Sequence, residues 1–122
     1  MVYSMGTDAI KTNEVLRFII ANSLITKAQL EIISTRLAGQ RPSNRSKGAY
    51  YRLLAQSRTK IRGIIFSVLL LEMVGLLDQQ SKEVLGRLAR QVAMAQRSDI
   101  DERTARDLIL LIEELVKRVS RL

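Results

Sequence analysis

The chain has 122 residues, of which 47% are hydrophobic and 26% are charged, and this balance excludes a chain that is disordered throughout. Its 20 Lys and Arg residues against 12 Asp and Glu residues give a formal net charge of +8, which favours a polyanionic partner. Cysteine and histidine are both absent, which excludes thiol nucleophiles, disulfides, imidazole catalysis and zinc clusters built on these residues.

The first helix is predicted from a capping residue and an apolar stripe. Asn13 is a favourable N-cap, although a start near Thr7 fits the same pattern, and Asn22 with Ser23 marks the end. The apolar residues expected on one face of this helix are Val15, Leu16, Ile19 and Ile20.

The second helix begins with the spacing of a capping box. Thr26 and Gln29 lie three residues apart, so that the hydroxyl and the amide oxygen can each accept a bond from a free backbone N–H. Gly39 fits the left-handed position that closes a helix, and a polar loop is expected over 40–47. The buried stripe predicted for this helix consists of Leu30, Ile33 and Leu37.

Residues 41–62, called the basic segment below, hold seven basic side chains and no acidic one. Two adjacent tyrosines, Tyr50 and Tyr51, lie among them. Because the basic segment supplies almost all of the net charge, it indicates a polyanionic partner such as a nucleic acid. The alternative interpretation is a solvated basic face without a partner.

A long helix is predicted to begin at Gly48 and to stop near Gly75, whose missing Cβ suits a helix end. Beyond Gly63 apolar residues surround this helix, so we expect that half to enter the core. The apolar run 61–77 contains Glu72 and is too short for a membrane span, and the N-terminus lacks a signal-peptide pattern. We therefore expect a cytoplasmic protein. The apolar face predicted for this helix consists of Tyr50, Leu53, Leu54, Ser57, Ile61, Ile64 and Val68.

The C-terminal part is predicted to form a helical hairpin over about 81–122, with Ser81 as the first cap and Ser98 or Asp99 starting the last helix. The acidic residues within 98–102 fit a magnesium site, but capping of the last helix explains them without a metal and is preferred. The last helix also carries an apolar stripe with coiled-coil spacing. Packing on the chain's own core and homodimerisation both explain this stripe. The stripe consists of Leu108, Ile112, Leu115, Val119 and Leu122.

Arg and Gln side chains can bond base edges when their helix enters a major groove, and Lys and Arg neutralise phosphates. The residues predicted for groove contacts are Arg52, Gln56, Thr59 and Arg62, and those predicted for phosphate contacts are Arg41, Arg45, Lys47, Arg58 and Lys60. The two tyrosines would stack on unpaired bases if the partner were a single strand. Tyr50 lies on the apolar face, however, and is expected in the core.

Two stretches of the long helix resemble the winged helix-turn-helix proteins. Residues 71–77, Leu-Glu-Met-Val-Gly-Leu-Leu, look like the Leu-Glu-x-x-Gly-Leu-Leu ending that follows the recognition helix in that family, and residues 57–62 are similar to the entry to that helix. The resemblance implies a first helix over 48–56 and a recognition helix over 59–74. A second register, with 26–37 as the first helix and Gly39 in the turn, is the alternative. The resemblance also implies which residues face DNA, and these are Ser57, Arg58, Thr59, Lys60 and Arg62.

Together these patterns predict one all-α domain of about five helices over 1–122, with a helix-turn-helix-like region over about 26–77. The predicted function is non-enzymatic binding of nucleic acid, with double-stranded DNA favoured over RNA, by a small transcriptional regulator or nucleoid-associated protein. No cofactor, metal or small-molecule substrate is expected. The alternative function is a helical subunit of a ribonucleoprotein or another multiprotein complex, in which the basic segment follows an RNA backbone.

Overall fold

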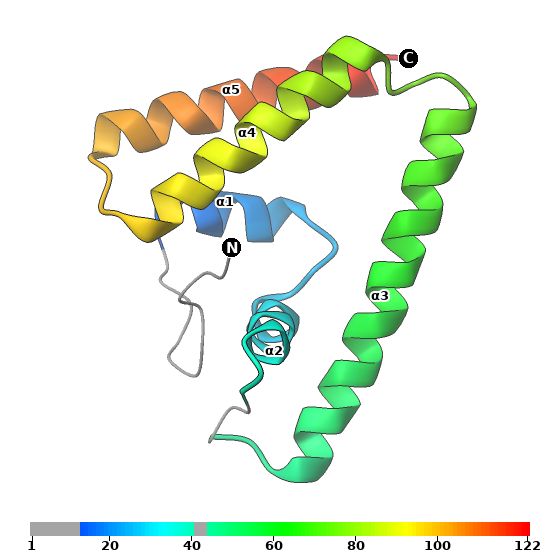
Figure 1. The fold of residues 1–122 in the computed structure, drawn as a ribbon. Coiled ribbons are helices and arrows are strands. Elements are labelled where there is room, and N and C mark those ends of the chain that lie inside the picture. The colour runs from blue at the N-terminus through cyan, green and yellow to red at the C-terminus, as the bar shows by residue number, and fades with distance from the viewer. Residues whose placement is uncertain (1–12, 41–43) are drawn as a thin grey trace. The chain divides into compact units, whose positions relative to one another are not determined.

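The computed structural model describes residues 13–40 and 44–122, and these contain five helices and no strand, which confirms the all-α prediction (Figure 1). The helices are α1 (Glu14–Asn22), α2 (Lys27–Leu37), α3 (Lys47–Met73), α4 (Gln79–Arg97) and α5 (Glu102–Ser120). Among the described residues, no helix is long and apolar enough to cross a membrane.

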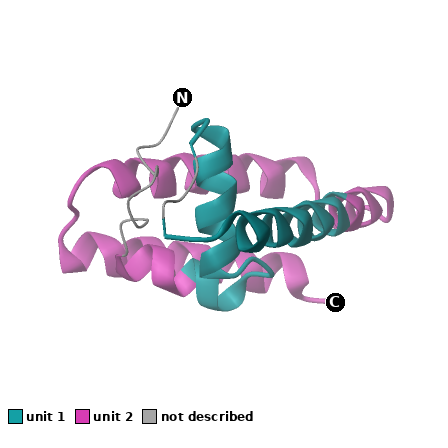
Figure 2. Cartoon of the chain, turned by 90° about the horizontal axis from the view of Figure 1, so that it is seen from below, with its two compact units in different colours: residues 1–12, 19–65 teal, residues 13–18, 66–122 magenta. Residues whose placement is uncertain are grey.

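The chain divides into two units, shown in teal and magenta in Figure 2. Unit 1 contains residues 1–12 and 19–65, so that its described part holds α2 and the first nineteen residues of α3. Unit 2 contains residues 13–18 and 66–122, which include the first turn of α1, the end of α3, α4 and α5. The helix α3 therefore belongs to both units, its first nineteen residues to unit 1 and the rest to unit 2.

Unit 1 has a small core in which α2 contributes Ile32 and α3 contributes Tyr50 and Leu54, with Leu53 packed at the edge. The buried stripe of α2 differs from the prediction, because Leu37 is 79% exposed while Ile32 is fully buried. Thr35 shares the buried face with Ile32, one turn further on. Its hydroxyl donates to the Glu31 carbonyl within the helix, which lets a polar side chain occupy the interior.

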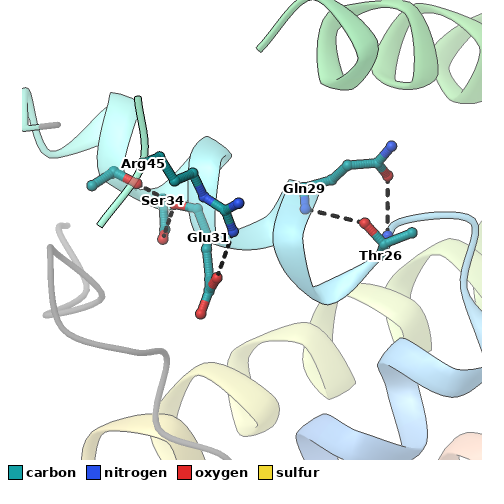
Figure 3. Close-up of polar contacts among 6 residues, drawn as sticks. Thr26, Gln29, Glu31, Ser34 and Arg45 are labelled. Atoms are coloured by element: carbon teal, nitrogen blue, oxygen red, sulfur yellow. Dashed lines mark hydrogen bonds and ion pairs between the residues drawn. The ribbon is translucent and has the colours of Figure 1, made fainter. Parts of the chain in front are cut away.

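The start of α1, both ends of α2 and the end of α3 are formed by the expected residues. The Asn13 side chain accepts a bond from the Leu16 amide at 2.8 Å, and Thr26 and Gln29 form both bonds of a capping box (Figure 3). After α2 and α3, Gly39 and Gly75 have φ values of +72° and +83°, in the left-handed region. At both positions the amide of the glycine and the amide of the next residue donate to carbonyls of the last turn in the Schellman pattern, which explains why each helix stops there.

In unit 2, α4 and α5 pack side by side as a hairpin (Figure 1). The first turn of α1 joins this unit through the Asn13 side chain, whose Nδ2 donates to Gln96 Oε1 at 3.0 Å. The buried apolar residues of the unit come from α1, α4 and α5, and they are Val15, Leu16, Leu88, Ala95, Ala105, Leu108 and Leu115.

The caps of α4 and α5 differ from the sequence expectation by a few residues. Asp78, not Ser81, caps α4 by accepting the Ser81 amide at 2.7 Å, and Asp101 caps α5 by accepting the Thr104 amide at 2.7 Å. A carboxylate is as good an N-cap as a serine hydroxyl and is also favoured by the helix dipole, which explains the earlier start of α4.

The expectation that the second half of α3 enters the core is wrong. The large apolar side chains from Ile65 to Met73, and that of Val74 directly after the helix, are all exposed, from 40% at Leu71 to 73% at Met73. A helix that is apolar all round usually indicates burial, but none of the residues that the structure describes covers this one. Glu72, within the same run, is exposed and pairs with Lys82 of α4 at 2.9 Å.

Candidate nucleic-acid interface

The first half of α3 has the two faces that the sequence predicts. Tyr50, Leu54 and Ser57 are buried on one side, within unit 1. Arg52, Gln56 and Thr59 are exposed, and their i, i+4, i+7 spacing places them together on the opposite side of the helix. The structure therefore brings three of the predicted groove-contact residues onto one exposed face.

Cationic side chains flank this exposed face. Lys47, Arg58 and Arg62 are exposed and Lys60 is half-buried, while α3 contains no carboxylate before Glu72. Neither these four side chains nor Arg52 forms an ion pair with another described residue. The face is therefore electropositive and has no internal counter-charge along nineteen residues of helix in unit 1.

Arg45 differs from the other predicted phosphate contacts. Its Nη2 lies 3.5 Å from Glu31 Oε1, and this ion pair joins the loop before α3 to α2 (Figure 3). Its charge is thus partly neutralised within unit 1. Arg41, the remaining predicted phosphate contact, lies outside the described residues.

The boundary between two helices that the resemblance implies near Ser57 is wrong, because α3 runs without a break from Lys47 to Met73. The hydroxyls of Ser57 and Thr59 donate to the carbonyls of Leu53 and Ala55, four residues earlier, so the helix continues through both. Ser57 is 1% exposed and does not face outward, in contrast to what the resemblance implies. The order of helix, loop and helix in the second register corresponds to α2 and α3.

The two tyrosines of the basic segment have different surroundings. Tyr50 is 3% exposed in the core of unit 1, as the periodicity predicts, and Tyr51 is 40% exposed on the flank that also carries Arg58. Only Tyr51 is therefore placed where it could stack on a base.

The predicted dimerisation stripe of α5 is partly buried within unit 2. Leu108 and Leu115 are 7% and 8% exposed, Ile112 and Val119 are half-buried, and Leu122 is fully exposed. Packing on the chain's own core therefore accounts for Leu108 and Leu115. The exposed apolar residues of α5 lie elsewhere on the helix, and they are Leu110, Leu111 and Val116.

The aspartates that cap α4 and α5 accept hydrogen bonds within the first turn of their own helix. The side-chain and backbone hydrogen bonds from Thr104 lower the pKa of Asp101, and the backbone amide of Ser81 does the same to the pKa of Asp78. Within residues 13–40 and 44–122 no group of three or more acidic residues is arranged to hold a metal ion. Capping accounts for the position of Asp101.

Two features were missed at the level of sequence. The first is the exposed apolar half of α3, because periodicity cannot distinguish a buried helix from one that lacks a cover. The second is an apolar hollow of about 350 Å³ in unit 2, between the end of α4 and the start of α5. Its lining includes Met94, Ala95, Ile100, Leu108 and Leu111, and no sequence motif marks it.

No protein-family model, no curated protein and no solved structure matches this chain.

Proposed function

We propose that this chain is a cytoplasmic, non-enzymatic protein that binds double-stranded DNA through the exposed face of the first half of α3. The observation that carries the proposal is the set of cations on that face that have no ion-pair partner among the described residues. In the proposed complex Arg52, Gln56, Thr59 and Arg62 enter a groove, while Lys47, Arg58 and Lys60 contact phosphates.

The binding free energy would come mainly from counterion release. Each phosphate neutralised on B-form DNA contributes about −0.9 to the slope of log K against log salt concentration. The five unpaired cations of α3 therefore predict a slope of roughly −4 to −5 per chain. Arg52 and Gln56 have the side chains that can bond guanine and adenine edges bidentately, which would add sequence preference.

Fluorescence anisotropy with labelled duplex DNA, titrated at several salt concentrations, tests the proposal. Replacing Arg52 and Arg58 together with alanine should weaken binding and reduce the magnitude of the salt slope by about 2. The matched control is the double alanine variant at Arg87 and Arg90, which removes the same charge from exposed positions of α4. Unchanged affinity in the folded α3 variant, or an equal loss in both variants, would contradict the proposal.

A specific observation favours a second candidate, a subunit of a ribonucleoprotein. Tyr51 is 40% exposed and lies seven residues before Arg58, on the same side of α3. Aromatic and cationic side chains in that arrangement bind unpaired bases and the backbone of a single strand. Tighter binding to single-stranded RNA than to duplex DNA, lost on Tyr51→Ala, would favour this candidate over the first.

A further inference from the structure

The proposed function does not use the exposed second half of α3 or the residue directly after it. Residues 65–74, called the apolar segment below, contain two polar residues, Ser67 and Glu72. The other eight are large apolar residues and all are exposed: Ile65, Phe66, Val68, Leu69, Leu70, Leu71, Met73 and Val74.

The area of this surface matches that of a protein–protein interface. Eight large side chains that are about half exposed present on the order of 800 Å² of apolar surface. The largest apolar patch of a typical monomer is about 300–600 Å², whereas each partner in a stable complex buries about 800 Å². The apolar segment therefore presents as much apolar surface as one subunit of a stable dimer buries, of which a single facing helix would cover a part.

We propose that the apolar segment pairs with the same segment of a second copy of this chain, in antiparallel orientation, about a two-fold axis near Leu69 and Leu70. A second copy fits because an isologous contact needs one self-complementary surface, and this surface is almost uniformly apolar. Its one charge, on Glu72, is already paired with Lys82 and need not be desolvated alone.

The charge distribution along α3 decides the orientation. All cations of the helix lie between Lys47 and Arg62, on the N-terminal side of the apolar segment. A parallel pair would place two such basic halves side by side, and like charges in that arrangement repel. An antiparallel pair brings the apolar segments together and moves the basic halves to opposite ends of the contact.

Unit 2 supplies further apolar surface for the same partner. One neighbouring helix cannot cover a segment that is apolar on all sides. Leu85 and Met94 of α4 and Leu110, Leu111 and Val116 of α5 are exposed in the unit that contains most of the apolar segment. The second copy can therefore bury additional residues beyond the pair of α3 helices.

This dimer does not depend on the proposed function, because it is measured without any nucleic acid. Light scattering or sedimentation equilibrium on the full chain should give twice the mass of one chain at micromolar concentration. Leu69→Asp should halve that mass, because a carboxylate would be buried at the two-fold axis. The matched control, Leu37→Asp, changes an even more exposed leucine of α2, at 79% against 59% for Leu69, and should leave the mass doubled.

The absence of cysteine makes the orientation directly testable. In an antiparallel pair centred between Leu69 and Leu70, position 66 of one copy lies opposite position 73 of the other. Phe66→Cys and Met73→Cys chains, refolded together and oxidised, should form a disulfide-linked heterodimer, and neither variant should cross-link alone. This readout requires no disruption of the fold.

A folded wild-type chain with the mass of a monomer would overturn the proposal, including a monomer that binds phosphatidylcholine vesicles through the apolar segment. A dimer in which each cysteine variant cross-links to itself would overturn the antiparallel pairing. A dimer whose mass is unchanged by Leu69→Asp and which forms no 66–73 disulfide would place the interface outside the apolar segment.

Discussion

The rings of Tyr50 and Tyr51 meet edge to face, with centroids 5.1 Å apart and planes at 81°, although the two side chains lie in different environments. Tyr50 is 3% exposed in the core of unit 1, and Tyr51 is 40% exposed beside the cations of α3. The pair thus joins the packed interior of unit 1 directly to the face that we propose binds nucleic acid.

Tyr50→Phe should stabilise unit 1. The Tyr50 hydroxyl is buried and has no hydrogen-bond partner among the described residues, so its desolvation is uncompensated. We expect removal of this oxygen to raise the free energy of unfolding by about 1 kcal/mol, measured by urea denaturation. Tyr51→Phe, at the exposed neighbour, should change it much less. A loss of stability on Tyr50→Phe would show that the hydroxyl has a partner in solution.

Glu31→Gln should strengthen nucleic-acid binding if the proposed function is correct. The Glu31 carboxylate lies 3.5 Å from the Arg45 guanidinium, and the neutral amide would release that cation for a phosphate. The log–log salt slope should become steeper by about 0.9, the value for one added phosphate contact. Glu83→Gln on α4 removes the same charge at an exposed position and serves as the control. Equal slopes for both variants would contradict a role for Arg45.

Replacing glycine with alanine should lower the stability of the protein at the end of α3 and raise it in the middle of the helix. Gly75 has φ +83°, which an L-residue adopts at a cost, so Gly75→Ala should destabilise the protein by roughly 1 kcal/mol. At Gly63 a Cβ would meet nothing within 4 Å, so Gly63→Ala should stabilise it by roughly 0.5–1 kcal/mol. Thermal unfolding followed by circular dichroism distinguishes the two. Equal effects would mean that helix propensity, not the left-handed conformation, controls both positions.

Stability should fall in acid because of the caps of α4 and α5. Hydrogen bonds from the backbone of Ser81 and from Thr104 lower the pKa values of Asp78 and Asp101 below their ordinary value of 3.8. A carboxyl group whose pKa is lower in the folded state stabilises the fold above its unfolded pKa, and this contribution disappears as the pH falls through the folded pKa. The effect therefore lies below about pH 4.

The double variant Asp78→Asn and Asp101→Asn tests this assignment, because asparagine caps a helix without titrating. Its melting temperature should depend less on pH between about pH 2 and pH 5 than that of the wild type. Asp107→Asn, within α5 and away from its cap, is the control. An unchanged acid dependence in the double variant would assign the titration to other carboxyl groups.

The start of α1, both ends of α2 and the end of α3 were predictable from sequence because they depend on single residues and their near neighbours, whereas the caps of α4 and α5 lie a few residues from the predicted ones. Asn13, Thr26 with Gln29, Gly39 and Gly75 all act as expected, since each makes or permits hydrogen bonds within one helical turn. The exposed row of Arg52, Gln56 and Thr59 was predictable for a similar reason, because charge and periodicity agree along that stretch.

The buried faces were less predictable because they depend on neighbours distant in sequence. Helix α2 has apolar residues on two sides. The side that contains Ile32 is buried, although the side that contains Leu37 is the more apolar of the two. The same limit applies to the second half of α3, where the pattern indicates burial but does not say which chain supplies the cover. The pairing of Arg45 with Glu31 also joins residues fourteen apart in sequence, which no local rule anticipates.

The unbroken length of α3 sets a distance. An α-helix rises about 1.5 Å per residue, so Gln56 lies roughly 20 Å along the axis from the midpoint between Leu69 and Leu70. In the proposed antiparallel dimer the two Gln56 side chains would thus be separated by roughly 40 Å along the paired helices. One turn of B-form DNA measures about 34–36 Å, so the two basic faces would be spaced for neighbouring turns of the same duplex. Inserting or deleting residues between Gln56 and Leu69 would then change the spacing that the dimer prefers between the two DNA sites it contacts, because the length of α3 would set that spacing.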